Sequence, residues 1–119
     1  MSDAGLFVKA GNINDYTEGT KKKVSVSGNE ILVAKAGNKY FAINNKCPHM
    51  GGDLSQGKLE GTIITCPRHG SQFNISDGSV IRWTNFGGIV KTLSQAIKSP
   101  RNVKTYEVKI EGENILVKV

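Results

Sequence analysis

The chain contains two cysteines and two histidines, and all four fall into two short, matched segments. The first segment reads CPHMGG from Cys47 to Gly52, and the second reads CPRHGS from Cys66 to Ser71. The pattern is therefore Cys-x-His, then sixteen intervening residues, then Cys-x-x-His. Thiolate sulfur and imidazole nitrogen are ligands for iron or zinc. A tight turn directs both side chains of a segment into one pocket, so we expect a metal centre that two loops share.

The residues around these side chains suit such a centre. Pro48 and Pro67 follow the cysteines directly and stiffen both turns. Glycine follows the histidine within each segment and lets the backbone approach a bulky cofactor closely. Two cysteines and two histidines also form a common structural zinc set, although zinc sites usually group the cysteines and the histidines separately. The mixed order within each segment favours an iron–sulfur cluster, and a zinc-stabilised interaction module remains the alternative.

The motif closely resembles that of the Rieske proteins, in particular the soluble Rieske-type ferredoxins, and the lysine-rich composition is similar to archaeal members. The resemblance implies one Rieske-type [2Fe–2S] cluster, with Cys47 and Cys66 on one iron and His49 and His69 on the other. It also implies that Ser71 binds the cofactor through a hydrogen bond to a bridging sulfide. Replacing two cysteines by histidines removes negative charge from the cluster and raises its reduction potential.

Three positions depart from the respiratory members of this family. Those members carry tyrosine at the position of Phe73, where its hydroxyl contacts a ligand cysteine. They also carry cysteines at the positions of Gly52 and Arg68, which form a disulfide between the loops. Phe73 cannot make that hydrogen bond, so we expect it to pack under the loops. The three departures together predict a potential in the lower part of the Rieske range.

The rest of the chain reads as an all-β protein. Alternating polar and apolar residues, bounded by Gly/Asn/Asp turns, predict short strands and two hairpins. The resemblance implies an antiparallel β-sandwich base with a small cluster-binding subdomain of two loops. We expect one domain over residues 1–119, with the subdomain at about 45–75 and an insertion at about 82–101 that contains one short helix over Thr92–Lys98. The expected strands are Leu6–Lys9, Lys23–Val26, Glu30–Lys35, Lys39–Ile43, Thr62–Thr65, Phe73–Asn74, Ser79–Arg82, Val103–Glu111 and Ile115–Val119.

The charge and hydrophobicity of the chain indicate which classes of partner and location to expect. The net charge is +6, but the lysines are scattered and only residues 21–23 form a short run. This pattern favours a solvated surface over nucleic-acid binding. No apolar stretch is long enough to span a membrane, and the N-terminal residues do not resemble a signal peptide. We therefore expect a cytoplasmic monomer with no membrane anchor.

These observations favour a soluble one-electron carrier rather than an enzyme. A catalytic oxygenase iron commonly needs two further histidines and a carboxylate, and both histidines are already committed to the motif. No G-x-G-x-x-G motif for a nucleotide cofactor is present. By family likeness the partners are a reductase and a terminal oxygenase-like acceptor. The alternative within the same chemistry is a small Rieske subunit of a larger oxidoreductase such as nitrite reductase.

Overall fold

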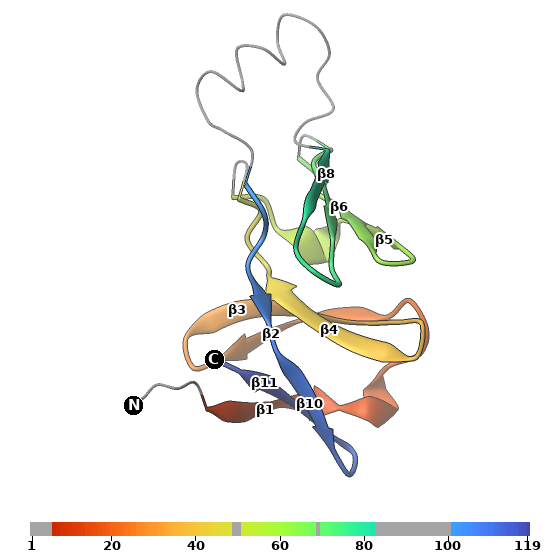
Figure 1. Cartoon of the computed structure of the whole chain (residues 1–119), viewed down its shortest axis with the longest axis vertical. Helices are drawn as coiled ribbons and strands as arrows, with labels where there is room; N and C mark the ends of the chain where they lie inside the picture. Colours follow the sequence, from red (N-terminus) through yellow and green to blue (C-terminus); the bar gives the residue numbers. More distant parts are fainter. Residues whose placement is uncertain (1–5, 49–50, 69, 83–100) are drawn as a thin grey trace, which may run out of the picture.

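The computed structural model describes residues 6–48, 51–68, 70–82 and 101–119. These residues form three antiparallel sheets, which are stacked along the long axis of the molecule in Figure 1. The lower sheet has the order β1-β11-β10, the central sheet β2-β3-β4-β9 and the upper sheet β5-β6-β7-β8. The strands are β1 (Phe7–Asn12), β2 (Lys21–Val26), β3 (Asn29–Ala36), β4 (Lys39–Asn44), β5 (Lys58–Glu60), β6 (Ile63–Thr65), β7 (Gln72–Asn74), β8 (Val80–Arg82), β9 (Thr105–Tyr106), β10 (Val108–Glu111) and β11 (Asn114–Lys118). Two short 3-10 turns, η1 (Ile13–Asp15) and η2 (Leu54–Gln56), complete the described elements.

β3, an inner strand of the central sheet, is buried on both of its faces. Its residues 31 to 34 are all buried. Because successive side chains of a strand point to opposite faces, both faces of β3 must be covered. Ile31 and Val33 face the lower sheet, where they pack with Ile115 and Val117 of β11. Leu32 and Ala34 face the upper sheet and join a second core. One strand therefore contributes to two separate cores.

The second core reaches the predicted metal site. Cys47, Cys66 and Phe73 belong to it, together with Leu32 of β3 and Ile64 of β6. The central sheet thus supports the upper sheet and both cysteine loops from below. This arrangement confirms the all-β class and the antiparallel sandwich base expected from the sequence.

Most expected strands are present, with small shifts at their ends. One expectation was wrong: residues 103–111 do not form a single strand. The chain pairs with β4 at Thr105 and Tyr106, breaks at Glu107, and then pairs with β11 from Val108. β9 and β10 therefore belong to different sheets. The sequence analysis also missed the short strand β5, which pairs with β6.

The insertion expected at about 82–101, with its short helix, lies almost entirely outside the described residues. Its two described ends lie close together. The backbone N–H of Val80 donates to the side-chain oxygen of Asn102 at 3.1 Å, and the N–H of Val103 donates to the carbonyl of Gly78 at 2.9 Å. The chain therefore leaves and rejoins the fold at the β7–β8 hairpin. In the described part of the chain, no helix is long and apolar enough to cross a membrane.

Candidate metal centre

The two cysteine segments adopt the same backbone arrangement. The N–H of Cys47 donates to the carbonyl of Gly52 at 2.8 Å, and the N–H of Gly51 donates back to the carbonyl of Cys47 at 2.8 Å. In the second segment, the N–H of Cys66 donates to the carbonyl of Ser71 at 2.7 Å, and that of Gly70 returns to Cys66 at 3.1 Å. The backbone of each cysteine therefore hydrogen-bonds to the backbone of the residues four and five positions later, and these two hydrogen bonds close each loop.

A glycine with positive φ makes each loop possible. Gly51 has φ +74° and Gly70 has φ +76°, a region that residues with a Cβ rarely adopt. These glycines occupy the same position in the two loops, four residues after the cysteine. The glycines that the sequence analysis associated with a close backbone approach are therefore needed first for the turn itself.

Both cysteine side chains are buried, with 2% of Cys47 and 3% of Cys66 exposed. They belong to one core and come from neighbouring loops. The outer parts of the same loops remain accessible, since Gly51, Pro67 and Arg68 are exposed. The sulfurs are thus shielded while the loops reach the surface.

Gly52 lies directly against the sulfur of Cys66. A Cβ atom at position 52 would lie 2.7 Å from Cys66 Sγ and 3.0 Å from Cγ and Cδ of Arg68. Atoms at such separations overlap, so a side chain at position 52 would displace the sulfur or the arginine stem. Positions 52 and 68, at which the respiratory members carry cysteines, are therefore neighbours in this structure. The aliphatic stem of Arg68 fills the space between the two loops.

Ser71 and Phe73 both lie beneath the loops and are fully buried. Phe73 packs in the core that includes both cysteines, as the sequence analysis predicted. Ser71 and Asn45 are the buried polar residues within the described ranges. The Ser71 side chain therefore lies inside the protein at the end of the second loop.

The predicted ligands His49 and His69, and the neighbouring Met50, lie outside the described residues. The structure therefore brings together the two cysteines and Ser71 of the predicted set. Among the described residues, no three or more His, Cys, Asp or Glu side chains lie close enough together to hold a metal ion.

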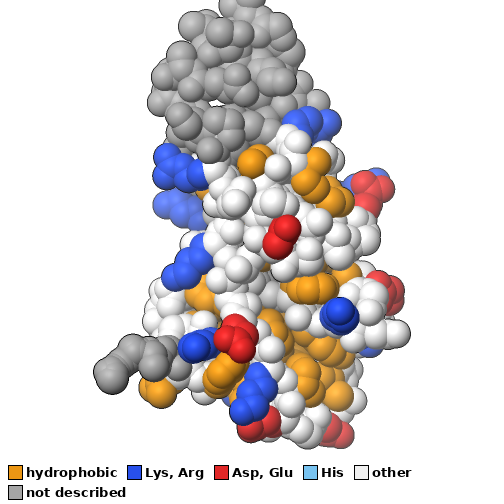
Figure 2. All heavy atoms as spheres, in the orientation of Figure 1, with side chains coloured by type: hydrophobic (Ala, Val, Ile, Leu, Met, Phe, Trp, Pro, Cys, Tyr) orange, Lys and Arg blue, Asp and Glu red, His pale blue; other side chains and the backbone are white. Residues whose placement is uncertain are grey.

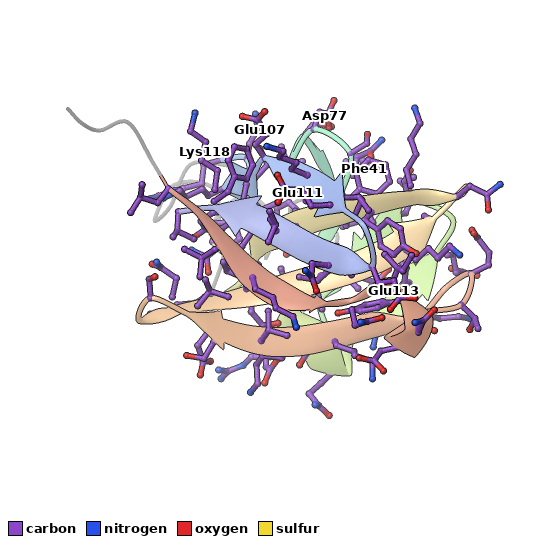
Figure 3. All side chains as sticks on the ribbon, turned by 90° about the horizontal axis from the view of Figure 1, so that it is seen from below. Phe41, Asp77, Glu107, Glu111, Glu113 and Lys118 are labelled. Atoms are coloured by element: carbon purple, nitrogen blue, oxygen red, sulfur yellow. The ribbon has the colours of Figure 1, made fainter. Side chains whose placement is uncertain are left out.

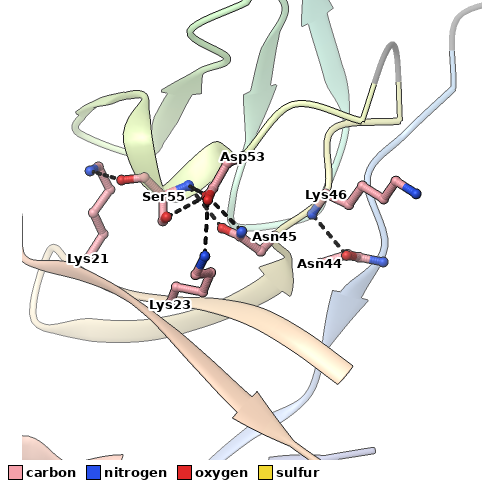
Figure 4. Close-up of polar contacts among 7 residues, drawn as sticks. All are labelled: Lys21, Lys23, Asn44, Asn45, Lys46, Asp53 and Ser55. Atoms are coloured by element: carbon pink, nitrogen blue, oxygen red, sulfur yellow. Dashed lines mark hydrogen bonds and ion pairs between the residues drawn. The ribbon is translucent and has the colours of Figure 1, made fainter. Parts of the chain in front are cut away.

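A polar network that the sequence analysis missed fastens the first loop to the central sheet (Figure 4). Asp53 follows the loop and accepts hydrogen bonds from the Asn45 amide at 2.8 Å and the Ser55 hydroxyl at 2.5 Å. Its other carboxylate oxygen pairs with Lys23 of β2 at 3.1 Å. The Asn45 side-chain oxygen in turn accepts the N–H of Ser55 at 2.9 Å. The network joins residues on either side of the loop to a strand of the sheet below.

These donors favour the charged form of Asp53. The hydrogen bond from Ser55, followed by those from Asn45 and Lys23, holds the pKa of the Asp53 carboxyl well below its usual range. A lowered pKa in the folded state means that the ionised group stabilises the fold. That stabilisation is complete above the unfolded-state pKa of about 4 and declines as the pH falls below it.

A second contact braces the other loop. The Arg82 side chain, at the end of β8, donates from Nε to the carbonyl of Gly70 at 3.1 Å. Because Gly70 follows His69 directly, the guanidinium stands beside the predicted ligand loop. No pattern in the sequence indicated this contact.

The geometry suits an iron–sulfur centre. Two thiols lie buried in one core, two loops of matched backbone present them, and a glycine leaves room beside one sulfur. Soft thiolate ligands in a shielded pocket are what such clusters require.

A comparison with protein-family models matches residues 7–107 to the Rieske [2Fe-2S] domain. The chain belongs to the Rieske [2Fe–2S] domain family. As a Rieske domain it carries one [2Fe–2S] cluster of the Rieske type. The resemblance drawn from the motif is thereby confirmed.

Relatives and solved structures extend along nearly the whole chain. The ferredoxin component of a naphthalene 1,2-dioxygenase/salicylate 5-hydroxylase system from Ralstonia sp. is 30% identical over 115 residues, covering 95% of each chain. The ferredoxin of carbazole 1,9a-dioxygenase from Nocardioides aromaticivorans IC177 has a similar fold, with a TM-score of 0.76, 24% identity, and coverage of 93% of this chain and 95% of that one. A chain from a complex of reduced oxygenase and oxidised ferredoxin in carbazole 1,9a-dioxygenase also matches in fold, with a TM-score of 0.76, 23% identity, and coverage of 96% and 94%.

The contact between Gly52 and Cys66 leads to a first prediction. Gly52→Ala should lower the free energy of unfolding by about 1–3 kcal/mol, the usual cost of inserting a group into a packed site. It should also reduce the iron bound per chain, because the added Cβ displaces the Cys66 sulfur. Urea unfolding and iron analysis measure the two effects. Gly11→Ala is the matched control, since a Cβ there meets Tyr16 at an ordinary 3.7 Å; equal behaviour of the two variants would contradict the prediction.

The network at Asp53 leads to a second prediction. Asp53→Asn should reduce stability at pH 7 by about 1 kcal/mol, the typical net contribution of one hydrogen bond, because the neutral amide weakens the bonds from Ser55 and Lys23. The difference from the unmodified protein should shrink as the pH falls from 5 toward 3, because the Asp53 carboxyl of the unfolded chain then takes up a proton while the native carboxyl is still ionised. Urea unfolding across this range, with bound iron monitored in parallel, measures both effects. Glu60→Gln removes a carboxylate from the exposed Lys58 pair and should change little; a difference for Asp53→Asn that does not vary with pH would refute the assignment.

Proposed function

We propose that this protein is a one-electron carrier whose cluster is held by Cys47 and Cys66 on one iron and by His49 and His69 on the other. The observation that carries the proposal is the pair of buried cysteines, which two loops of matched backbone present to one core. The family match and the ferredoxin relatives support the carrier role. The assignment of the two histidines rests on their place in the motif.

The cluster, when bound, supplies a site that gains and loses one electron without a change in the covalent structure of the protein. The chain's own residues set the conditions for that exchange. The buried cysteines and Phe73 exclude water from the thiolate side. Each histidine belongs to a loop with an exposed residue, Gly51 in the first loop and Arg68 in the second, so we assign the electron port to the imidazole side.

Ser71 is assigned to the cofactor-binding set. Its side chain is fully buried, and its carbonyl accepts the N–H of Cys66, which fixes the residue at the end of the second loop. A hydroxyl hydrogen bond to a cluster sulfide would stabilise the more negative reduced state and raise the potential. This role agrees with the burial of a polar group at that position.

The partners in this proposal are a reductase as donor and a terminal oxygenase as acceptor. The names of the relatives support them, since these are ferredoxin components of dioxygenase systems. We assign to this chain the carrier role and not the catalysis. The proposal also includes a single domain, a monomeric state and a cytoplasmic location, where cysteines remain reduced and available as ligands.

A spectrum of the reduced protein tests the cofactor and its ligands. The purified protein should be reddish-brown, contain two irons and two sulfides per chain, and give a paramagnetic resonance signal with the low average g-value of mixed nitrogen and sulfur ligation. Cys47→Ser and Cys66→Ser should each abolish that signal, whereas Lys58→Ser on the upper sheet should preserve it. A colourless protein with one zinc per chain would overturn the proposal in favour of the interaction module.

Two substitutions beneath the loops test how the surroundings set the potential. Phe73→Tyr should raise the midpoint potential, because its hydroxyl can donate toward a ligand cysteine. Ser71→Ala should lower the potential, because a donor to the cluster is lost. Protein-film voltammetry at pH 7 measures both shifts, and the resonance spectrum shows whether the cluster is intact. Shifts of the same sign, or no shift in either variant, would contradict this account.

A further inference from the structure

The end of the molecule that carries the two loops has an uneven charge. In the described residues 44–48, 51–68, 70–82 and 101–106, six lysines and arginines stand against three acidic residues. Two of those acidic residues are already paired, Asp53 with Lys23 and Glu60 with Lys58. The third, Asp77, lies in the β7–β8 turn, where it accepts the N–H of Ser79. Positive charge around the loops is therefore largely uncompensated.

Five exposed cations make up this surface, which we term the cationic end: Lys46, Arg68, Arg82, Arg101 and Lys104. None of them joins an ion pair with another described residue. Figure 2 shows Lys and Arg side chains along the left edge and at the upper right of this half of the molecule. Other acidic side chains lie on the lower sheet and next to it: Figure 3 shows Glu111 at the end of β10, Glu113 in the turn that follows, and Glu107 just before β10.

The fold itself places these cations beside the loops. Lys46 directly precedes Cys47, and Arg68 packs its stem against Gly52 within the second loop. Arg82 bonds to Gly70. Lys104 lies on the returning segment, where its carbonyl accepts the N–H of Asn44 at 2.8 Å and its ammonium stands 4.9 Å from the Tyr106 ring centre.

The cationic end contains a groove. Its volume is about 290 Å³, and it lies between the first loop and the returning segment. Lys46 and Lys104 line it together with Cys47, Pro48 and Asn102. Two cations and an amide beside a ligand cysteine suit the carboxylate of an inserted acidic side chain.

We propose that the cationic end is the docking surface for an acidic face of the redox partner, with a partner carboxylate seated in the groove between Lys46 and Lys104. This inference rests on the proposed carrier function. Complementary charge at an electron port increases the encounter rate and orients the two proteins, and it does so most strongly at low salt. An acidic protein is favoured over nucleic acid because the cations lie on or beside the two cysteine loops, which a redox partner must approach, and because the groove is of side-chain size.

Small redox probes of opposite charge test the surface. The dithionite-reduced protein, freed of excess reductant, is mixed in a stopped-flow instrument with ferricyanide or with tris(phenanthroline)cobalt(III). Raising the salt from 10 to 300 mM should slow the anionic probe about tenfold or more and should not slow the cationic one. Lys46→Glu/Lys104→Glu should slow ferricyanide at least about fivefold at low salt. The matched control Lys9→Glu/Lys39→Glu makes the same change of net charge on the base, and should alter the rate less than about twofold.

Competition identifies the class of partner. Poly-L-glutamate should inhibit the ferricyanide reaction of the unmodified protein and of the control, but not of Lys46→Glu/Lys104→Glu. A 20-base-pair DNA duplex that inhibits more strongly than poly-L-glutamate at equal charge concentration would overturn the protein partner. Equal rates for the two double variants would overturn the docking surface. In both of these cases the cluster is still reduced by dithionite, whereas a protein with no reducible cluster refutes the carrier function itself.

Discussion

The two-sided burial of the inner strands β3 and β4 is the constraint on which the rest of this structure depends. Neighbouring residues of β3 enter different cores, so the same strand holds the lower sheet on one face and the cysteine loops on the other. β4 repeats the pattern, with Ala42 in the lower core and Ile43 in the upper one. The position of the metal site is thus fixed by the period-two geometry of an extended chain. A shift of one residue in the pairing of either strand would exchange the two cores.

Much of this architecture could be predicted from the sequence, because hairpin strands and turn residues leave a local signal. The pattern over residues 103–111 correctly predicted extended chain at 105–106 and 108–111. It could not indicate that the strand pairs with β4 before Glu107 and with β11 after it, since alternation does not identify the neighbouring sheet. The three-residue strand β5 was too short for any periodic signal. Local patterns therefore predicted the elements better than their partners.

The predicted site shows the same limit. Cys47, Cys66 and Ser71 could be identified because their types and spacing are unusual. In the structure all three side chains are buried, and they come from the two closed loops. Asn45 and Asp53 could not be identified, since common polar residues eight positions apart form no recognisable motif. Their importance arises only when the loop between them closes. The residues that hold the loop in place can be recognised only in the structure, whereas the residues of the motif can be recognised in the sequence.

The glycine at position 52 has a consequence for how this protein can change. Converting it to the disulfide-bridged type of the respiratory proteins requires cysteines at positions 52 and 68. In this backbone a Cβ at position 52 overlaps the Cys66 sulfur, so the first substitution displaces that sulfur before a bridge can form. Replacing Arg68 first would remove the stem that fills the space between the loops. The two forms are therefore separated by a barrier of packing, and exchange between them requires the loop backbone to move as well.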